Sequence, residues 1–404
     1  MKKLIIFHHY NSSIGAGLSL LHILQSLNTL ELNVEVCLPN IQGDLDKKIQ
    51  EMGYNVFYSE HITPYMHFSG NHAPFFSIKH LVNCYRVKNS MGQIEKIISN
   101  KHPDYIAVNS MTLFWIGRIA QQCGAKAICF HRESYRKGLL GIRTNYIKKN
   151  LSRNFDVVAF LSNYDMNQTP KGSARYIRIT DKVDVKKYNM LEKNKCRKSE
   201  NLPKDSNLIL YTGGMARLKG PEIIIKAIPL LKSENTKLIF LQYYEQDISG
   251  IVSKIKYYIK SILGQNIEFN IKHFIKKEGL KDKIIFKPAT DHVENYFIAC
   301  DVVVFPSLDA HQARPAYEAG IAKRPFIITD FPNTREFADQ SNAWVFKRGD
   351  SKALACCIDE ALSGKLKDKV IKNYEKTVKN NNLDTMREEL LNLFKLVEVN
   401  RNDD

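Results

Sequence analysis

The chain has 404 residues, of which 44% are hydrophobic and 25% are charged, and it contains 13 prolines. This ordinary globular composition excludes a disordered or collagen-like chain, and the length predicts two domains of about two hundred residues each. The formal net charge of +17 indicates an anionic substrate, an anionic membrane surface or a nucleic acid as partner. A chain rich in Lys, Ile and Asn can also acquire such a charge from biased genome composition, so charge alone does not choose among these.

The N-terminal segment predicts a first strand rather than a targeting signal. After Met1, Lys2 and Lys3 only residues 4–7 form an apolar run, which is shorter than the apolar region of a signal peptide. No apolar run approaches the roughly 20 residues of a membrane-spanning helix, so we expect a cytoplasmic protein. The eight cysteines include no C-x-x-C pair, which favours reduced core thiols over zinc ligands or disulfides.

Short apolar runs alternate with helical patterns through the first half of the chain. The expected strands are 4–7, 34–38, 55–58, 105–108, 127–130 and 157–161, and the expected helices include 18–27, 78–98 and 113–123. Alternation of this kind predicts a parallel sheet that is covered by helices on both faces.

The alternation breaks in the charged stretch 185–206 and then resumes. The second series has strands at 208–211, 237–241, 283–286, 302–305 and 325–329, helices at 221–231 and 351–362, an insert of two amphipathic helices at 248–279, and a helical end at 370–399. We therefore predict an α/β protein with two Rossmann-like, doubly wound domains. The N-terminal domain is placed at 1–185, the C-terminal domain at 186–370, and a C-terminal helix that could cross back to the N-terminal domain at 371–404.

The clearest candidate site follows the strand 208–211. Gly213 and Gly214 allow a sharp turn and close approach to a ligand, and Gly220 before Pro221 is suited to a helix start. Arg217 and Lys219 place two cations at the carboxyl end of a strand, where open α/β sheets bind ligands. The pattern favours a diphosphate over a solvated turn.

A second candidate site follows the strand 302–305. Arg314 precedes Pro315, which is suited to a first helical position, so the next backbone amides would favour a phosphate. Glu318 would then lie in the first helical turn, where it could accept both hydroxyls of a ribose. The alternative is a carboxylate that only complements the helix dipole.

These motifs resemble the family 4 glycosyltransferases of the GT-B type, over most of the C-terminal half and more loosely over 1–185. The resemblance implies two Rossmann-like domains facing a central cleft, with the acceptor bound by the first and the donor by the second. It implies a retaining hexosyltransferase of cell-surface polysaccharide synthesis, in which Arg217 and Lys219 hold the donor diphosphate and Glu318 binds ribose. The expected donor is a UDP- or GDP-sugar, and no cofactor or metal is expected.

The chain departs from this family at one position. The family has a second glutamate eight residues before the ribose-binding one, near the donor sugar, and this chain has Ala310 there. The neighbouring Asp309 is a candidate catalytic substitute. The family mechanism needs no protein nucleophile, because the leaving phosphate oxygen can deprotonate the acceptor on the same face, so transfer can survive the change.

Three features of the N-terminal half bear on the same site. Gly15 and Gly17 precede an apolar helix and resemble the family's glycine loop beneath the donor phosphates, although they form no complete dinucleotide fingerprint. His131, after the strand 127–130, resembles the family histidine that faces the transferred sugar, and it could instead be a packing histidine; Arg132 and Glu133 are expected to pair with each other. Asp44-Leu45-Asp46 is interpreted as a helix start and not as a metal triplet.

The acceptor is expected to be a glycan or a lipid-linked sugar. Residues 135–149 combine basic and apolar side chains, which favours either contact with an anionic membrane surface or a solvated helix with its apolar side packed inward. A nucleic acid is an unlikely partner because the cations are dispersed and no recognition module is present. The alternative functions are a non-hydrolysing nucleotide-sugar epimerase, a non-enzymatic basic binding protein, and a catalytically silent relative.

Overall fold

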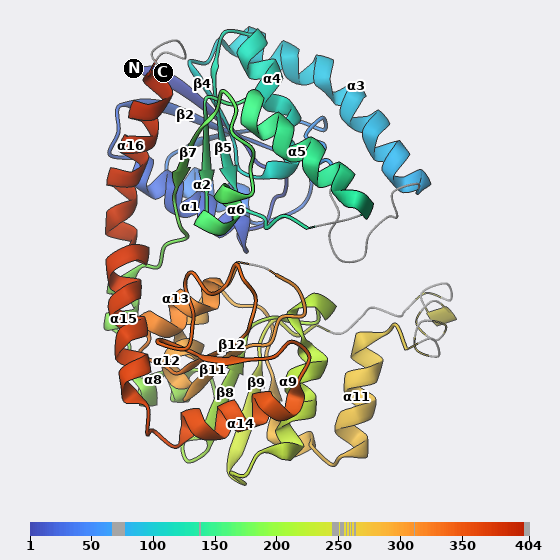
Figure 1. The fold of residues 1–404 in the computed structure, drawn as a ribbon, viewed down its shortest axis with the longest axis vertical. Helices are drawn as coiled ribbons and strands as arrows, with labels where there is room; N and C mark the ends of the chain where they lie inside the picture. The colour runs from blue at the N-terminus through green and yellow to red at the C-terminus, as the bar shows by residue number, and fades with distance from the viewer. Residues whose placement is uncertain are drawn as a thin grey trace. The chain divides into compact units, whose positions relative to one another are not determined.

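The computed structural model describes residues 1–66, 77–136, 139–244, 250, 254–255, 257, 259, 261, 264–310 and 312–399. The chain divides into two compact units (Figure 1). Unit 1 comprises Met1–Lys182 with Leu383–Asp404, and unit 2 comprises Val183–Asn382. The first division lies three residues before the predicted limit of 185, and the second lies at 382 where 370 was predicted. The end of the chain belongs to unit 1.

Unit 1 contains a seven-stranded parallel sheet in the order β3-β2-β1-β4-β5-β6-β7. Its strands are β1 (Lys2–Phe7), β2 (Leu32–Leu38), β3 (Asn55–Tyr58), β4 (Tyr105–Val108), β5 (Lys126–His131), β6 (Val157–Phe160) and β7 (Arg175–Arg178). Successive residues of β1 point to opposite faces, so Ile5 and Phe7 enter one core while Leu4 and Ile6 enter another. Burial on both faces explains why these strands read as continuous apolar runs.

Helices cover both faces of this sheet (Figure 1). One face packs against α3 (Ile78–Lys101), α4 (Trp115–Gln122) and α5 (Ile142–Arg153), with the 3₁₀ turn η1 (Met111–Leu113) before α4. The other face packs against α1 (Ala16–Leu27), α2 (Leu45–Glu51) and α16 (Met386–Glu398). A short helix α6 (Asn163–Asn167) follows β6.

Unit 2 contains a six-stranded parallel sheet in the order β10-β9-β8-β11-β12-β13. Its strands are β8 (Asn207–Tyr211), β9 (Thr236–Phe240), β10 (Ile284–Phe286), β11 (Val302–Phe305), β12 (Phe326–Thr329) and β13 (Trp344–Phe346). One face packs against α8 (Lys193–Ser199), α12 (Val293–Ala299), α13 (Arg314–Ile321) and α15 (Lys367–Asn381), and the other against α9 (Pro221–Ala227), α11 (Ile267–Lys277) and α14 (Ser351–Leu362). The predicted α/β class with two doubly wound domains is confirmed.

The charged stretch 185–206, where the apolar alternation breaks and no helix was predicted, contains two short helices. It forms α7 (Val185–Asn189) and α8. Arg197 of α8 is only 4% exposed, and its guanidinium donates to the carbonyl oxygens of Ala299 (2.9 Å) and Ser206 (3.2 Å) and to Asp301 (2.7 Å). The buried Arg197 fixes α8 to the domain through hydrogen bonds, where another helix would use an apolar side chain. A search for apolar periodicity therefore does not detect this helix.

Other predictions differ in detail. Strands β7 and β13 were not predicted, and the helical end 370–399 is two helices, α15 and α16, joined by the 3₁₀ turn Leu383–Thr385. Of the insert predicted at 248–279, α11 is present and most of 245–263 lies outside the described residues. All eight cysteines are free, and Cys356 is exposed rather than in a core. Among the described residues no helix is both long and apolar enough to cross a membrane.

Candidate functional site

Each sheet reverses its strand order at one place, and the predicted site residues gather there. The reversal lies between β8 and β11 in unit 2 and between β1 and β4 in unit 1. Ligands of open α/β sheets bind beyond the carboxyl ends of the strands at such a point. The predicted donor-binding residues of unit 2 lie on the loop after β8 and at the start of α13, which follows β11. Those of unit 1 follow β1, with Gly15 just before α1 and Gly17 in its first turn.

The loop after β8 is a tight turn that its glycines make possible. A Cβ atom on Gly213 would lie 2.3 Å from the hydroxyl oxygen of Tyr211, and Gly214 has a φ of +58°. Tyr211 is fully buried, and its hydroxyl donates to the carbonyl oxygen of Gly214 at 3.0 Å. The buried phenol therefore fixes the turn from beneath, which leaves the outer side of the loop open to a ligand.

The loops after β8 and β11 are bonded to each other. The Leu308 amide donates to the carbonyl oxygen of Leu218 at 2.7 Å, and the Ser307 hydroxyl lies 3.0 Å from the same oxygen. A Cβ atom on Gly220 would lie 1.9 Å from the carbonyl oxygen of Pro306, so only glycine allows this approach. Arg217 and Lys219, which flank Leu218, are thereby held beside the loop that carries Asp309.

Arg217 and Lys219 are two cations that lack acidic neighbours. Within the part of the chain that the structure describes, neither side chain forms an ion pair. Burial lowers the pKa of the Lys219 ammonium from its usual value, whereas Arg217 is exposed. Desolvation of an uncompensated cation disfavours the charge, and a bound anion would restore it. This arrangement suits a diphosphate.

Helix α13 begins one residue earlier than predicted, at Arg314, with Pro315 second. Glu318 therefore lies one turn along the helix and not in the first turn, so its interpretation as a simple dipole partner does not apply. Its Oε1 lies 3.3 Å from Nε of Arg314, and both side chains are largely buried, at 9% and 17% exposure. The carboxylate is held in place by Arg314 before any ligand binds.

Asp309 lies on the bonded loop, next to the position of the missing family glutamate. Its Oδ1 accepts a hydrogen bond from the Ala310 amide at 2.8 Å, and its carbonyl oxygen lies 2.7 Å from the Ser307 hydroxyl. The side chain is partly exposed. The Ser307 hydroxyl thus lies within hydrogen-bond distance of Leu218 on the other loop and of Asp309 on its own, a position that the sequence did not reveal.

The glycines after β1 serve a close turn as well. Gly15 has a φ of +60°, and a Cβ atom on Gly17 would lie 1.9 Å from the carbonyl oxygen of Ser12. Asp44, at the start of α2, accepts from the Ser13 amide at 3.0 Å and pairs with Lys48 at 3.3 Å. Asp44 thus holds Ser13 of the glycine loop in place. Among the described residues no group of three or more His, Cys, Asp or Glu side chains could hold a metal ion.

His131 ends β5 and is 1% exposed. Its ring lies between Tyr135 and Phe160, with centroid distances of 4.7 and 4.9 Å, and its Nε2 has no hydrogen-bond partner among the described residues. Burial lowers the pKa of the imidazole, so the ring is neutral near physiological pH. A buried nitrogen without a partner costs free energy until a ligand supplies one.

Arg132 and Glu133 were expected to pair with each other, and each makes other contacts. Nε of Arg132 donates to Asn109 Oδ1 at 2.9 Å, and its NH1 lies 3.4 Å from Asp181. Glu133 accepts from the Met111 amide at 3.0 Å and from the Ser110 hydroxyl. These contacts join the carboxyl ends of β4 and β5.

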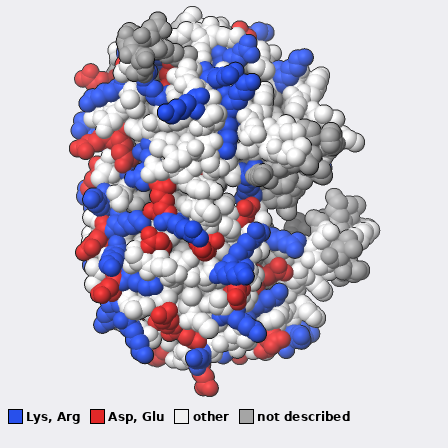
Figure 2. Space-filling view, in the orientation of Figure 1, with Lys and Arg blue, Asp and Glu red and all other residues white. Residues whose placement is uncertain are grey.

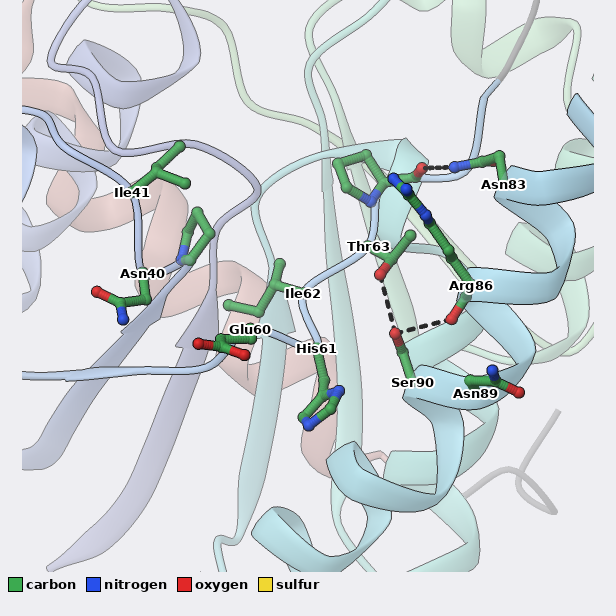
Figure 3. A pocket seen from close by; sticks show the side chains of 12 residues that line it. Asn40, Ile41, Glu60, His61, Ile62, Thr63, Asn83, Arg86, Asn89 and Ser90 are labelled. Atoms are coloured by element: carbon green, nitrogen blue, oxygen red, sulfur yellow. Dashed lines mark hydrogen bonds between the residues drawn. The ribbon is translucent and has the colours of Figure 1, made fainter. Parts of the chain in front are cut away.

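Unit 1 also contains a polar pocket of about 590 Å³ at the carboxyl ends of β2 and β3 (Figure 3). One wall is the loop with Glu60, His61 and Thr63, and the other is α3, where the Ser90 hydroxyl lies 2.8 Å from that of Thr63. The wall of α3 presents Asn83, Arg86, Asn89 and Ser90. Sequence reasoning missed this pocket, although these residues recur at helical spacing on the predicted helix 78–98.

Residues 192–378 match the family model described as glycosyl transferases group 1. This range covers nearly all of unit 2 and contains Arg217, Lys219, Asp309, Arg314, Pro315 and Glu318. The C-terminal unit is therefore similar in sequence to the glycosyl transferases group 1 family. The resemblance noted in the loops after β8 and β11 is confirmed at this level.

Individual relatives agree with the family. D-inositol 3-phosphate glycosyltransferase of Paenarthrobacter aurescens is 29% identical over 150 residues, which are 37% of this chain and 33% of the relative. The match thus spans about a third of the curated relative's length.

Solved structures match over almost the whole chain. HepE of Anabaena, in complex with UDP and glucose, has a TM-score of 0.74 at 14% identity and covers 98% of this chain and 100% of its own. WaaG, a glycosyltransferase involved in lipopolysaccharide biosynthesis, has a TM-score of 0.67 at 13% identity and covers 97% of this chain and 99% of its own. The glycosyltransferase domain therefore lies within a GT-B fold.

Proposed function

We propose that this protein is a retaining glycosyltransferase that moves a sugar from a UDP-sugar to a glycan or lipid-linked acceptor in cell-surface polysaccharide synthesis. The observation that carries the proposal is the position of two cations, Arg217 and Lys219, which form no ion pair with any residue that the structure describes. Leu218 between them is hydrogen-bonded to the loop after β11. The group 1 family match over 192–378 supports transfer. HepE, which is crystallised with UDP and glucose, supports uracil as the base and hence a UDP-sugar over a GDP-sugar.

In this proposal the cations act on the leaving diphosphate. As the bond between sugar and phosphate lengthens, negative charge grows on the phosphate oxygens, and Arg217 and Lys219 neutralise it. Their loop is already fixed by Tyr211 and Gly220, so little reorganisation is needed when the charge develops. A phosphate oxygen then takes the acceptor proton on the same face of the sugar, which retains the anomeric configuration without a protein nucleophile.

Other site residues take supporting roles. Glu318, oriented by Arg314, accepts hydrogen bonds from the ribose hydroxyls. The neutral His131 offers its unpartnered Nε2 to a hydroxyl of the transferred sugar. Asp309 stands next to the absent family glutamate and is assigned to the donor sugar. Gly15 and Gly17 allow the tight turn of the loop after β1, which is assigned to the donor phosphates, and no metal or other cofactor is assigned to the reaction.

The polar pocket of Figure 3 is assigned to the acceptor sugar. Its amides, hydroxyls and Arg86 offer donors and acceptors for several sugar hydroxyls, while Pro39, Ile41 and Ile62 offer apolar surface to the sugar's carbon atoms. We place the protein in the cytoplasm and at the inner face of the membrane. The basic stretch 135–149 supports that placement in part, because Ile147 packs inward while Ile142 and Tyr146 stay exposed.

Thermal unfolding with a panel of nucleotides tests the donor assignment. UDP should raise the melting temperature by mass action, and Arg217→Ala or Lys219→Ala should remove most of the rise, because each deletes a charge-assisted contact of about 1.5 to 3 kcal/mol. Lys226→Ala, an exposed cation on α9, is the matched control and should respond to UDP as the wild type does.

Product analysis tests the stereochemistry. Transfer should give a product whose anomeric configuration equals that of the donor, as read from NMR coupling constants.

Unaltered UDP affinity in both cation variants by calorimetry would overturn the phosphate assignment, and an inverted product would overturn the mechanism.

A further inference from the structure

A second cavity in unit 1, of about 440 Å³, lies between α3, the turn η1 with the start of α4, and α5. Four large aromatic side chains line it: Tyr65, Phe114, Trp115 and Tyr146. The ring centroids of Tyr65 and Phe114 are 5.2 Å apart, and those of Phe114 and Tyr146 are 5.5 Å apart. Val87 and Met91 of α3 complete an apolar interior. Such a cavity suits a hydrocarbon chain rather than a sugar.

The cavity is also cationic. Arg143 lies in its lining at 5% exposure, and the exposed Lys88 stands on the α3 side. No acidic side chain occurs among the described lining residues. Burial, and after it the charge of Arg143, lowers the pKa of the His80 imidazole in the same lining. A buried guanidinium within an aromatic cavity is complementary to an anion.

The two helices that line the cavity carry large apolar side chains on the surface. On α3 these include Ile78 at 78% exposure and Leu81 at 63%. Around the start of α5 they are Leu140 at 79%, Ile142 at 45% and Tyr146 at 51%. Ile142 and Tyr146 belong both to the cavity lining and to this exposed set, so the cavity opens at an apolar rim. Exposed apolar rims mark sites of lipid or partner contact.

We propose that this cavity, the chain pocket, binds the hydrocarbon chain of a single anionic amphiphile, an alkyl or isoprenoid phosphate, with the phosphate held by Arg143 and Lys88. The aromatic side chains recognise the hydrocarbon chain, and the two cations of the lining recognise the negative charge. This site lies outside the polar pocket of Figure 3, whose lining is rich in amides and hydroxyls. The proposal rests on the proposed function only in giving the amphiphile the role of lipid-linked acceptor.

Tryptophan fluorescence reports on the chain pocket directly. The chain has two tryptophans, Trp115 in the pocket and Trp344 in unit 2. In a Trp344→Phe background, Trp115 is the single reporter. Decyl, undecyl and dodecyl phosphate, each below its critical micelle concentration, should change the emission saturably. Each added methylene should tighten binding about fourfold, the equivalent of ~0.8 kcal/mol.

Matched variants separate the pocket from the general surface. Tyr146→Ala and Lys88→Ala should each weaken dodecyl phosphate binding at least tenfold. Tyr85→Ala and Lys96→Ala change equally exposed side chains of α3 that do not line the pocket, and they should bind as the unmutated background does. Arg143→Gln should also weaken binding, with partial recovery in Arg143→Lys. Circular dichroism melts of every variant verify that the fold is kept.

Several outcomes would overturn the proposal. They are an affinity independent of chain length, equal affinity for a neutral dodecyl glycoside, and equal losses in the Tyr85 and Tyr146 variants. Adsorption to vesicles of anionic phospholipid without any binding of alkyl phosphates would assign the rim to surface contact alone. The fluorescence assay contains no sugar donor, so its result does not depend on UDP binding or on transfer. The proposal for the chain pocket and the proposed function can therefore fail independently.

Discussion

The two carboxylates near the donor loops occupy different environments. Glu318 is buried and paired with Arg314, whereas Asp309 is partly exposed and bonded to the amide that follows it. A buried, oriented carboxylate suits a constant part of the donor such as ribose. A more exposed one on a loop suits the variable part, the sugar.

This difference gives opposite expectations for two alanine variants. Glu318→Ala should weaken UDP and UDP-sugar binding alike, by a few kcal/mol at most, because the lost charge-assisted hydrogen bonds are common to both ligands. Asp309→Ala should spare UDP affinity and lower kcat, because its contact with the sugar contributes in the transition state. Calorimetry and steady-state kinetics measure the two effects. An unchanged transfer rate in Asp309→Ala would eliminate Asp309 as a substitute for the missing glutamate.

His131 gives a pH dependence with a defined sign. Burial lowers the pKa of its imidazole in the folded protein, whereas the unfolded chain titrates near 6.5. Below about pH 6.5 the unfolded state therefore binds more protons than the folded state. As the pH is lowered from there to the folded pKa of His131, the free energy of unfolding decreases by up to about 1.4 kcal/mol per pH unit for this one proton.

His131→Asn removes this titration. The variant should lose less stability than the wild type between pH 7.5 and pH 5.5, as measured by urea unfolding midpoints. His102→Asn, at an exposed position after α3, should decline as the wild type does. If the urea midpoints of wild type and His131→Asn change in parallel with pH, burial does not lower the pKa of His131 in the folded protein.

At the scale of elements, the donor site depends on how closely the loops after β8 and β11 approach. Gly220 and Gly349 both have positive φ, +73° and +76°, and differ in their surroundings. A Cβ atom on Gly220 would overlap the carbonyl oxygen of Pro306, whereas Gly349 has nothing within 4 Å. Alanine variants of the two glycines therefore distinguish the cost of backbone strain, which both share, from the cost of the contact between loops, which only Gly220 has.

Gly349→Ala should cost only the strain of a left-handed residue, about 1 to 2 kcal/mol of unfolding free energy. Gly220→Ala should cost more and should also weaken UDP binding, because Leu218 with its neighbouring cations is pushed away from the loop after β11. Equal stability losses with unchanged UDP affinity in both variants would mean that the loop contact does not set the site.

The elements predicted from sequence are those with two buried faces. Strands such as β4 and β11 were predicted with the observed limits, because burial on both sides leaves a continuous apolar run. The missed strand β7 lies at the sheet edge and is only partly buried, and its sequence Arg-Tyr-Ile-Arg carries no such run. Helix α8 was missed because its anchor is the buried Arg197.

Site residues could be proposed from the sequence where glycines, cations or a helix start follow a strand. Gly213, Arg217 and Glu318 were predicted on this ground, since the carboxyl ends of neighbouring strands meet, and their roles stay predictions. Ser307 and Tyr211 were not, because a hydroxyl that bonds a distant carbonyl leaves no mark in local spacing. The chain pocket was also invisible, since it joins Tyr65, Phe114 and Tyr146 from three separate segments.

At the scale of the molecule, the positive charge is dispersed. On the face shown in Figure 2, lysines and arginines are spread widely and acidic side chains lie between them. A protein that tracks a nucleic-acid backbone gathers its cations on one stripe or groove. The pattern on this face therefore fits local anion sites, such as Arg217 with Lys219, better than a nucleic-acid surface.

The division of the chain makes unit 1 discontinuous and unit 2 continuous. Where unit 2 begins and ends, the Val183 amide donates to the carbonyl oxygen of Asn381 at 2.7 Å, and Val183 and Asn382 form a parallel bridge. Its ends therefore meet and close the domain. Unit 1 needs α16, because Leu390 and Leu393 are fully buried in the core with Leu4 and Ile6.

Excision of the units tests this division. Residues 183–382 should fold alone, melt cooperatively and bind UDP, since all the donor residues assigned to unit 2 are present. Residues 1–182 alone should lose the α16 side of their core and leave the fully buried ammonium of Lys182 without Glu389, which lies 2.6 Å away. Joining 182 to 383 through a short Gly-Ser linker should restore a cooperative melt by circular dichroism, and an equally stable 1–182 fragment would show that α16 is dispensable to the core.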